Sequence, residues 1–356
     1  MKRKELYKNF LAVCLGLVMV FLALELFFTF IIPASNSPES FYDEADKIVK
    51  FKPNTEGTMT LGPWAEQPFY WHINNAGWNN LRDYDADDNR PLIAVIGDSY
   101  IQPIGVDIDK SYPVLLQEKL KAKYRVYQFG MSGAPLSQYL HMSRYVTAKY
   151  KPDIIIFNIV HNDFIESLSC YTLPGRNYMA IDSSSKKEVF LPFHSYLGIA
   201  QLARKSNLIC YLMRNLKINS TLVHQNLPVE TFDLMVDMPK QTAIREKVEE
   251  VTDLLLTRMK NENPDSKLVF VMDGLRTEIE LKNYENKTNS WLNRMMKDKV
   301  EALGIPFLDL TDYFQSEFNK NNTSFSSKVD PHWNNYGHHK VYEALYPFLL
   351  ENGIIE

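Results

Sequence analysis

The chain has 356 residues, of which 45% are hydrophobic and 23% are charged. This ordinary globular composition argues against a disordered, collagenous or low-complexity protein, and the length excludes a small scaffold that depends on disulfides or metals. Lys and Arg total 39 against 43 Asp and Glu, a net charge of -4, so the chain lacks the overall basic field that draws proteins to nucleic acid.

The amino-terminal segment predicts a membrane anchor. Residues 1–9 form a basic tail, and residues 10–32 are apolar except for Glu25 and Thr29. As a helix rising about 1.5 Å per residue, the apolar run would be about 34 Å long, enough to cross a hydrocarbon core. Because this run exceeds the usual apolar core of a signal peptide, an anchor is favoured over a cleaved signal or a buried helix. The positive-inside rule then predicts a single-pass protein of a bacterial inner (cytoplasmic) membrane, with its bulk periplasmic or otherwise extracytoplasmic.

Glu25 and the cysteines leave alternatives open. Glu25 lies near the exit side of the span, where a carboxylate costs less than at mid-membrane, so tolerated placement is favoured over pairing with a partner helix. Cys14, Cys170 and Cys210 have no metal-ligand spacing. Cys170 and Cys210 could pair in an oxidising compartment or remain two free thiols.

Beyond the anchor, residues 33–90 are rich in Asn, Pro, Gly and aromatic residues and predict a linker and an irregular arm. From residue 91 to residue 356, short apolar strands alternate with amphipathic helices, which predicts an α/β fold with a parallel sheet flanked by helices. Residues 164–240 break this alternation and predict an insertion, such as a lid, with a candidate helix at 197–215. The expected strands are 91–97, 125–129, 153–160, 267–272 and 306–310, and the expected helices are 111–123, 136–150, 241–263, 289–303 and 334–350.

Reactive or polar residues follow the first three predicted strands, and another set precedes the last predicted helix. Ser99 follows the first strand, Gly133 the second and Asn162 the third, while Asp330 and His332 stand just before the final helix. Ligands of open parallel sheets bind at the carboxyl ends of the strands. A serine, a histidine with a nearby carboxylate, and two donors at that edge are the groups that acyl transfer requires. Each signal is weak alone, but together they predict a serine-based site.

These segments resemble four of the conserved blocks of the SGNH/GDSL hydrolases, in the right order over about residues 91–351. The arm at residues 75–78 is similar to membrane-anchored bacterial members of that family. The resemblance implies a three-layer α/β/α SGNH fold behind one transmembrane helix, and a site that needs no metal or cofactor. It implies that Ser99 is the nucleophile, that His332 is the base and Asp330 its orienter, and that Ser99, Gly133 and Asn162 form the oxyanion hole.

Two departures from the family pattern bear on function. Val160 stands where the third block usually has glycine, and Asp330 lies two residues before His332 rather than three. The resulting Asp-x-His-Trp form resembles the membrane-associated polysaccharide acetylation branch, including alginate O-acetylation proteins. The resemblance implies an O-acyl esterase whose substrate is an acylated glycan or lipid, most plausibly an acetylated envelope glycan. Two alternatives stay open: an O-acetyltransferase supplied by a membrane acyl-donor protein, and a catalytically silent glycan-binding or assembly subunit.

Other polar residues near these segments have weaker roles. Asp98 and Asp163 are expected to hold their loops rather than to act as acids or bases. His161, Asp273 and Arg276 are candidate substrate-binding residues, although a hydrogen-bonded histidine and an ordinary Asp-Gly turn explain them equally simply. His338 and His339 are expected on a solvated helix face rather than in a metal site, because the local sequence supplies no further ligands.

Overall fold

The computed structural model describes residues 2–85, 87–172, 179–193, 199–218, 242–282 and 290–356. The chain divides into two compact units. Unit 1 comprises Met1–Ser37, Thr58–Pro68 and Tyr196–Leu227, and unit 2 comprises Pro38–Gly57, Phe69–Ser195 and Pro228–Glu356.

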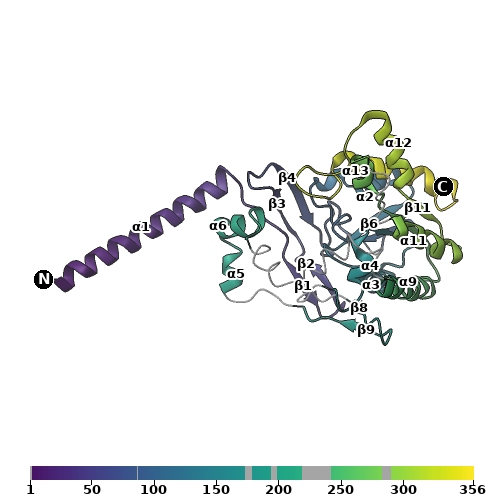
Figure 1. The fold of residues 1–356 in the computed structure, drawn as a ribbon, viewed down its shortest axis with the longest axis horizontal. Coiled ribbons are helices and arrows are strands. Elements are labelled where there is room, and N and C mark those ends of the chain that lie inside the picture. Colours follow the sequence, from purple (N-terminus) through teal and green to yellow (C-terminus); the bar gives the residue numbers. More distant parts are fainter. Residues whose placement is uncertain (1, 86, 173–178, 194–198, 219–241, 283–289) are drawn as a thin grey trace. The chain divides into compact units, whose positions relative to one another are not determined.

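Unit 2 is built on a parallel sheet of five strands, which confirms the predicted α/β architecture (Figure 1). The strands are β5 (Leu92–Gly97), β6 (Arg125–Gly130), β7 (Ile154–Ile159), β10 (Lys267–Met272) and β11 (Phe307–Asp309). Their order is β11-β10-β7-β5-β6, so β5 lies between β7 and β6. In the register of the sheet, Gly97 pairs with Gly130 and Met272 pairs with Ile159. The carboxyl ends of these strands therefore meet at one edge.

The strands are apolar because the sheet is covered on both faces, as is usual for parallel sheets. Ile93 and Val95 of β5 join a core with side chains from α2, α12 and α13. Phe157 and Phe270 lie on the opposite face and stack with ring centroids 5.0 Å apart. The covering helices are α2 (Tyr112–Leu120), α3 (Leu136–Tyr150), α9 (Thr242–Glu262), α11 (Ser290–Ala302), α12 (Thr311–Asn321) and α13 (Asn335–Glu351).

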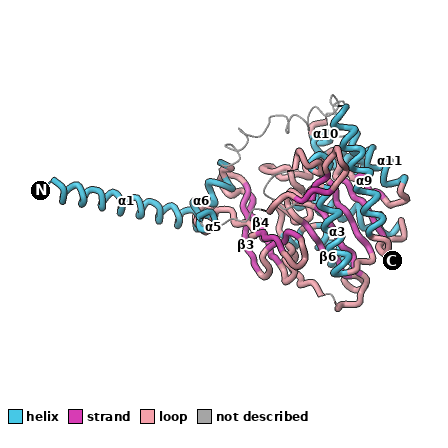
Figure 2. The backbone as a smooth tube through the Cα atoms, turned by 90° about the horizontal axis from the view of Figure 1, so that it is seen from below, coloured by secondary structure: helices cyan, strands magenta, loops and turns pink. Residues whose placement is uncertain are grey.

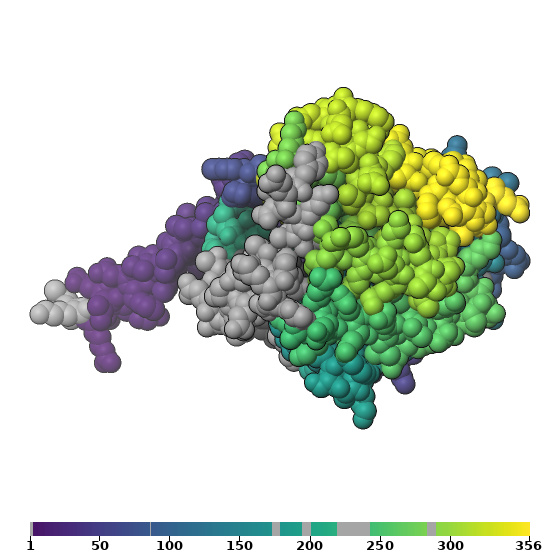
Figure 3. Space-filling view, turned by 45° about the vertical axis from the view of Figure 1, so that its right-hand side comes forward, coloured from purple at the N-terminus to yellow at the C-terminus, as the bar shows by residue number. Residues whose placement is uncertain are grey.

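The helices form the outer layers predicted for this fold. Figure 2 shows α3, α9 and α11 packed side by side, while α2 packs against α13 on the other face. The part of the chain from α9 to the C-terminus covers most of the face of unit 2 that is turned to the viewer in Figure 3. Each predicted strand and helix of the sheet domain is present within one or two residues, except that the helix predicted at 111–123 ends at Leu120. Helix α12 was not predicted.

Smaller elements precede the sheet in the chain or connect its strands. The predicted arm contains two antiparallel hairpins, β1 (Ser40–Asp43) with β2 (Ile48–Phe51) and β3 (Thr55–Leu61) with β4 (Gln67–Ile73). The remaining short elements of unit 2 are η1 (Ile108–Lys110), α4 (Asn162–Glu166), β8 (Met179–Ile181), β9 (Glu188–Phe190) and α10 (Arg276–Glu280). Three stretches of the predicted insertion, at 173–178, 194–198 and 219–240, lie outside the described residues.

Unit 1 contains the apolar helix α1 (Lys2–Phe30). Within Arg3–Phe30, an 18-residue window has a mean hydropathy of 2.7, and the helix is long enough to cross a membrane, properties that a signal sequence also has. The helix predicted at 197–215 is broken into α5 (Ile199–Ala203), α6 (Asn207–Cys210) and the π-helical turn η2 (Tyr211–Asn215). Cys14, Cys170 and Cys210 are free thiols.

Glu25 has a partner, contrary to the tolerated placement favoured from the sequence. Its carboxylate accepts hydrogen bonds from the backbone N–H groups of Asn207, at 2.8 Å, and Leu208, at 3.3 Å, and from the hydroxyl of Ser206. These donors belong to the first turn of α6, whose N–H groups have no partner within the helix. The sequence could not reveal this contact because Glu25 and Ser206 lie 181 positions apart in the chain.

Candidate active site

Ser99 lies in a tight turn directly after β5. The backbone N–H of Gln102 donates to the Asp98 carbonyl oxygen at 2.9 Å, and the N–H of Tyr100 donates to the Asp98 side chain at 2.9 Å. Asp98 is buried, and burial raises the pKa of its carboxyl group above the usual value. The expected loop-holding role of Asp98 agrees with these contacts. The turn presents the Ser99 side chain at the carboxyl edge of the sheet.

His332 reaches Ser99 from a loop that closes on itself. Ser326 and Trp333 form an antiparallel bridge, and the Ser327 N–H donates to the His332 carbonyl oxygen at 3.0 Å. Within this loop the Asp330 carboxylate accepts from the His332 backbone N–H at 3.0 Å and also contacts His332 Nδ1. The other ring nitrogen, Nε2, lies 2.7 Å from Ser99 Oγ. The structure thus brings together the three predicted residues in the order serine, imidazole, carboxylate.

This order has a chemical meaning. A carboxylate at Nδ1 fixes the tautomer that leaves Nε2 able to accept a proton from the serine hydroxyl. Ser99 Oγ also lies 3.2 Å from Asp98 Oδ2, a longer contact than the one with the imidazole. The spacing of two residues between Asp330 and His332 is sufficient because the loop lets one carboxylate contact both the backbone and the ring of His332.

The predicted oxyanion donors follow the two strands that flank β5. Gly133 follows β6 and adopts a φ of +72°, a left-handed conformation that glycine reaches without strain. At the end of the same strand, a Cβ on Gly130 would lie 2.1 Å from the backbone nitrogen of Gln102, so only glycine allows the two turns to approach. Asn162 begins α4, just after β7. The strand order therefore places the loops of Gly133 and Asn162 on either side of the Ser99 turn.

The turn that carries Asn162 is held by Asp163. Its buried carboxylate accepts from the Val160 N–H at 2.9 Å and from the Tyr139 hydroxyl at 2.8 Å. Burial, reinforced by the charge of Asp98, raises the pKa of the Asp163 carboxyl group well above the usual value. Val160 is accommodated at the position where the family usually has glycine, with its side chain buried.

Behind the histidine loop lies a buried network that sequence reasoning missed. Arg276 donates to both carboxylate oxygens of Asp273, at 2.8 to 3.1 Å, and to the Pro331 carbonyl oxygen at 2.9 Å. It also donates to the Tyr100 hydroxyl at 2.6 Å, while Trp333 Nε1 donates to Asp273 at 3.0 Å. The neighbouring carboxylate keeps the pKa of Arg276 above its usual value despite burial.

These contacts favour a positioning role for Asp273 and Arg276 over the substrate contact suggested from the sequence. Both side chains are less than 10% exposed, at 4% and 8%, and they bond to each other and to the loop. Tyr100 connects the two halves of the site, because it follows Ser99 and its hydroxyl contacts Pro331 O at 3.3 Å. The tyrosine that replaces the usual leucine after the Gly-Asp-Ser segment was the signal that could have revealed the network.

His161, the third candidate substrate contact, is half-buried and bonds to a helix. Its Nε2 lies 2.8 Å from Asn293 Oδ1 on α11. The amide of Asn293 donates to the Asp273 carbonyl oxygen at 3.2 Å and to the Asp309 carboxylate at 3.0 Å. Asn293 therefore ties the end of β7 to the ends of β10 and β11. A role for His161 toward substrate stays a prediction.

His338 does not lie on a solvated face, so that prediction was wrong. Its side chain is buried against Tyr112, whose backbone N–H donates to His338 Nδ1 at 3.3 Å, and burial lowers the pKa of His338 to about 3. His339 is exposed and pairs with Glu343 at 3.2 Å, as expected for a solvated position. Adjacent residues of a helix point in different directions, so His338 is buried while His339 is exposed. The sequence alone predicts both histidines on the same face.

Acid should destabilise the wild-type protein more than a His338→Gln variant. An unfolded histidine titrates near 6.5, so below that pH the unfolded chain binds a proton that the folded state does not bind until about pH 3. The contribution of His338 should therefore lower the unfolding free energy by about 1.4 kcal/mol for each unit by which the pH falls within this window. The loss should reverse when the pH is raised again to neutral. Urea unfolding at neutral and mildly acidic pH measures this slope. His339→Gln is the matched control and should keep the wild-type slope; equal slopes for wild type and His338→Gln would refute the assignment.

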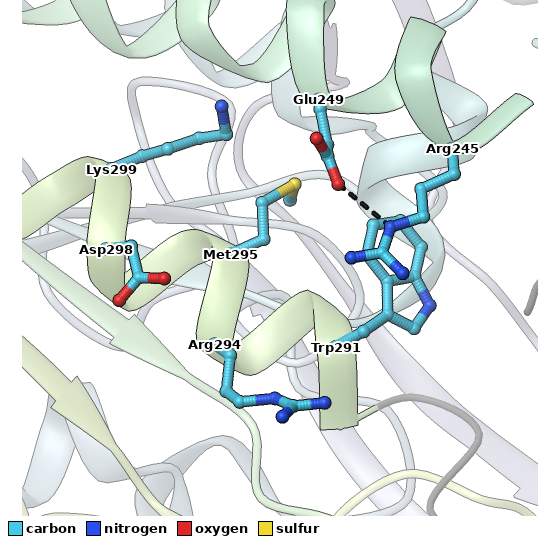
Figure 4. Close-up of a pocket in the computed structure, with 7 residues that line it drawn as sticks. All are labelled: Arg245, Glu249, Trp291, Arg294, Met295, Asp298 and Lys299. Atoms are coloured by element: carbon cyan, nitrogen blue, oxygen red, sulfur yellow. Dashed lines mark hydrogen bonds and ion pairs between the residues drawn. The ribbon is translucent and has the colours of Figure 1, made fainter. Parts of the chain in front are cut away.

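A surface groove lies elsewhere on unit 2, between α9 and α11 (Figure 4). The Arg245 guanidinium lies 4.8 Å from the centre of the Trp291 ring and bonds to Glu249 at 2.9 Å. None of the predicted site residues lines this groove. Lys299 at its edge pairs with Asp253 at 2.6 Å, and we assign the groove no role.

A parallel sheet with a serine, a histidine base and a carboxylate gathered at its carboxyl edge is an arrangement typical of serine-dependent hydrolases with an α/β fold. The chain belongs to the GDSL-like lipase/acylhydrolase family, whose model matches residues 95–340, and it is an ester-hydrolase-type enzyme. No curated protein sequence matches the chain.

Solved structures with a similar fold include an esterase, an enzyme described as an alpha/beta hydrolase and a lipase. The acetyl xylan esterase AlAXEase is 15% identical, with a TM-score of 0.43 over 72% of this chain and 98% of its own. LAE5, an alpha/beta hydrolase from the metagenome of Lake Arreo, Spain, is 16% identical, with a TM-score of 0.43 over 72% of this chain and 94% of its own. The extracellular lipase from Streptomyces rimosus is 14% identical, with a TM-score of 0.39 over 73% of this chain and 99% of its own.

Proposed function

We propose that the chain is a membrane-anchored serine esterase that removes O-acyl groups, principally acetyl, from an envelope glycan. The observation that carries the proposal is the 2.7 Å contact between Ser99 Oγ and His332 Nε2, with Asp330 at the opposite ring nitrogen. Family membership supports the ester chemistry. The glycan and the acetyl group rest on the resemblance of the Asp-x-His-Trp segment to polysaccharide acetylation proteins.

The proposed reaction has two steps. In the first, Ser99 Oγ attacks the acyl carbon while His332 Nε2 takes its proton; the ester C–O bond then breaks, and the proton passes from Nε2 to the leaving sugar oxygen. In the second, water attacks the acyl-enzyme and gives its proton to Nε2, the bond to Oγ breaks, and Oγ recovers the proton as the carboxylic acid leaves. Asp330 stabilises the imidazolium that forms in both steps. The N–H groups of Ser99 and Gly133 and the amide of Asn162 bind the oxyanion.

Anchoring through α1 is supported by the contacts of its C-terminal end. Besides the bonds from α6 to Glu25, Phe28 stacks on Tyr211 with ring centroids 4.0 Å apart. A signal peptide that is removed would have no need of partners in the mature chain. Expression of the full chain with a C-terminal tag tests this point, because an anchored protein keeps the mass of the whole sequence and stays in the membrane fraction after an alkaline wash.

The test of the enzymatic proposal uses the full chain in detergent micelles or nanodiscs. Wild type and Ser99→Ala are given an aryl acetate, with and without oligosaccharide acceptors, and the products are identified by mass spectrometry. Free acetate produced by wild type alone supports the esterase. Acetyl groups on the sugar would instead show that the protein is a transferase, in which a sugar hydroxyl takes the acyl group from the acyl-enzyme. If the wild-type protein is inactive and takes no acyl label on Ser99, the esterase proposal is wrong and a catalytically silent glycan-binding subunit is the hypothesis that survives.

Removing the Asn162 amide should lower kcat and leave KM almost unchanged. In the Asn162→Ala variant the oxyanion loses one donor, and the loss of such a donor typically lowers kcat by about 10²- to 10³-fold. Steady-state kinetics with an aryl acetate measure the effect, and thermal unfolding shows whether α4 is intact. A rise in KM at constant kcat would instead make Asn162 a ground-state binding residue.

A further inference from the structure

The extramembrane part of unit 1 has an unusual concentration of exposed apolar side chains. It is short, yet five large apolar residues in it are at least 40% exposed: Trp64 at 72%, Leu202 at 66%, Met213 and Leu216 at 41%, and Ile218 at 40%. Within the described residues of unit 2, which are several times more numerous, only Leu81, Phe190, Leu281, Val329 and Leu350 are exposed to a similar degree. Clustered exposed apolar residues mark a contact surface rather than ordinary scatter.

The same segment is basic. From Gln201 to Ile218 it contains Arg204, Lys205, Arg214 and Lys217 and not one acidic residue. Lys205 and Lys217 are exposed, next to exposed Leu202, Leu216 and Ile218. Basic residues interleaved with apolar ones in short helices are typical of segments that lie in the interface of an anionic membrane.

This surface is fixed to the end of the apolar helix (Figure 1). Glu25 accepts from the first turn of α6, and the Asn207 amide donates to the Thr29 hydroxyl at 2.7 Å. The Tyr211 hydroxyl donates to the Pro63 carbonyl oxygen at 2.7 Å, directly before Trp64. Asn215 donates to the hydroxyl of Thr60 and accepts from the N–H of Ser35, both at 2.9 Å. Residues 58–68 and 201–218 therefore form one body with the C-terminal end of α1, which we call the collar.

The height of the collar along α1 agrees with an interfacial position. Glu25 lies five residues before the end of α1 at Phe30, or about 8 Å at about 1.5 Å per residue. Amphipathic helices at a membrane surface bury their apolar face by about 5–10 Å. If α1 crosses the bilayer, the first turn of α6 thus lies at the boundary between headgroups and acyl chains. The carboxylate of Glu25 then accepts the hydrogen bonds of the first N–H groups of α6 at a depth where few water molecules are present to do so.

We propose that the collar is a second membrane contact, in which Trp64 and the apolar residues of 201–218 enter the interface of an anionic lipid surface while Lys205 and Lys217 meet its headgroups. The inference rests on the proposed anchoring by α1. It adds to that anchoring, because a single transmembrane helix leaves the attached domain free to rotate and tilt. A collar in the interface fixes the orientation of unit 1 relative to the membrane. The occupant is lipid rather than a second copy of the chain, because the surface is continuous with the membrane-crossing helix and is positively charged.

Trp64 makes the proposal directly measurable. Of the five tryptophans, Trp71, Trp78, Trp291 and Trp333 are at most 6% exposed and only Trp64 faces outward. The full chain is reconstituted into vesicles of phosphatidylcholine and phosphatidylglycerol, with bromine on the acyl chains either near the headgroup or near the chain end. The part of the fluorescence that disappears in Trp64→Phe should be quenched by about half or more, and more strongly by the shallow bromine than by the deep one.

Charge is tested in the same assay. In Lys205→Gln/Lys217→Gln the Trp64 quenching should fall toward the level seen in phosphatidylcholine alone, whereas Lys282→Gln/Lys297→Gln in unit 2 should behave as wild type. Co-flotation with the vesicles after an alkaline wash reports separately on α1. Release by the wash would refute both the anchor and the collar. A chain that stays with the vesicles but has unquenched Trp64 would refute the collar alone, and shielding of that Trp64 from aqueous acrylamide would then assign the surface to a second copy of the chain, the only protein present.

Discussion

Replacing Ser99 with alanine should lower kcat for an aryl acetate by about 10⁴-fold or more, and His332→Ala should have an effect of similar size. Either change removes one end of the 2.7 Å contact through which the hydroxyl would be activated. The double variant should be no worse than the poorer single variant, because the two groups act as a unit. Steady-state kinetics measure the loss, and labelling of Ser99 by a fluorophosphonate probe reports the nucleophile itself.

Ser185→Ala is the matched control, since Ser185 is an exposed serine in the turn between β8 and β9. It should retain wild-type kinetics and labelling. If the fold loss in kcat of the double variant equals the product of the two single losses, the two residues act independently. Undiminished turnover by Ser99→Ala would move the chemistry away from this serine.

Replacing Arg276 with methionine should both destabilise the protein and impair catalysis. The substitution leaves the Asp273 carboxylate buried without its partner, and breaking a buried pair in this way typically costs about 3–5 kcal/mol of unfolding free energy. It also removes the donor that holds the Pro331 carbonyl oxygen, next to His332. We expect a lower kcat with little change in KM, because Arg276 holds the loop of His332 in position and, being buried, does not contact substrate. Urea unfolding and steady-state kinetics measure the two effects.

A second pair of variants separates the two roles of Arg276. Asp273→Asn/Arg276→Met should recover much of the stability, since no unpaired charge stays buried, but it should not recover kcat, since Pro331 still lacks its donor. Tyr100→Phe provides the same test in a gentler form by removing only the hydroxyl between Arg276 and Pro331. Arg245→Met, which removes an exposed i,i+4 pair with Glu249 and the contact with the Trp291 ring, should change stability by only about 1 kcal/mol. Recovery of kcat along with stability would make the network purely structural.

The parts of the fold that the sequence predicted well are those set by local pattern. β5 and β7 are apolar runs in the sequence because they are buried on both faces, and α3 matches its predicted bounds of 136–150. Helix α12 escaped prediction because only Phe314 and Phe318 mark its buried face, and its first N–H is satisfied by the side chain of Asp309 in the preceding strand. No conventional capping residue marks where it begins.

The site followed the same rule. Ser99, Asp330 and His332 could be predicted because each lies in a short motif at the end or start of an element, where topology dictates the neighbours. The partners of Arg276 could not, because one is the backbone carbonyl of Pro331, which every residue type offers, and another is the hydroxyl of Tyr100, far away in the chain. Glu25 is similar: its partners are backbone N–H groups, and a sequence pattern does not show which segment supplies them.

The two halves of the site are held by very different means. Ser99 follows a strand whose backbone is paired on both sides, by β6 and by β7, and whose side chains are buried throughout. His332 sits in a loop fastened by one short bridge and otherwise by side-chain hydrogen bonds, among them those of Arg276, Tyr100 and Trp333. Amide hydrogens in β5 should therefore exchange with solvent only when the whole sheet opens, while those of residues 327–332 exchange through a local opening. Under mild denaturant the base leaves the nucleophile before the fold is lost, so inactivation precedes unfolding and the enzyme can recover without refolding its core.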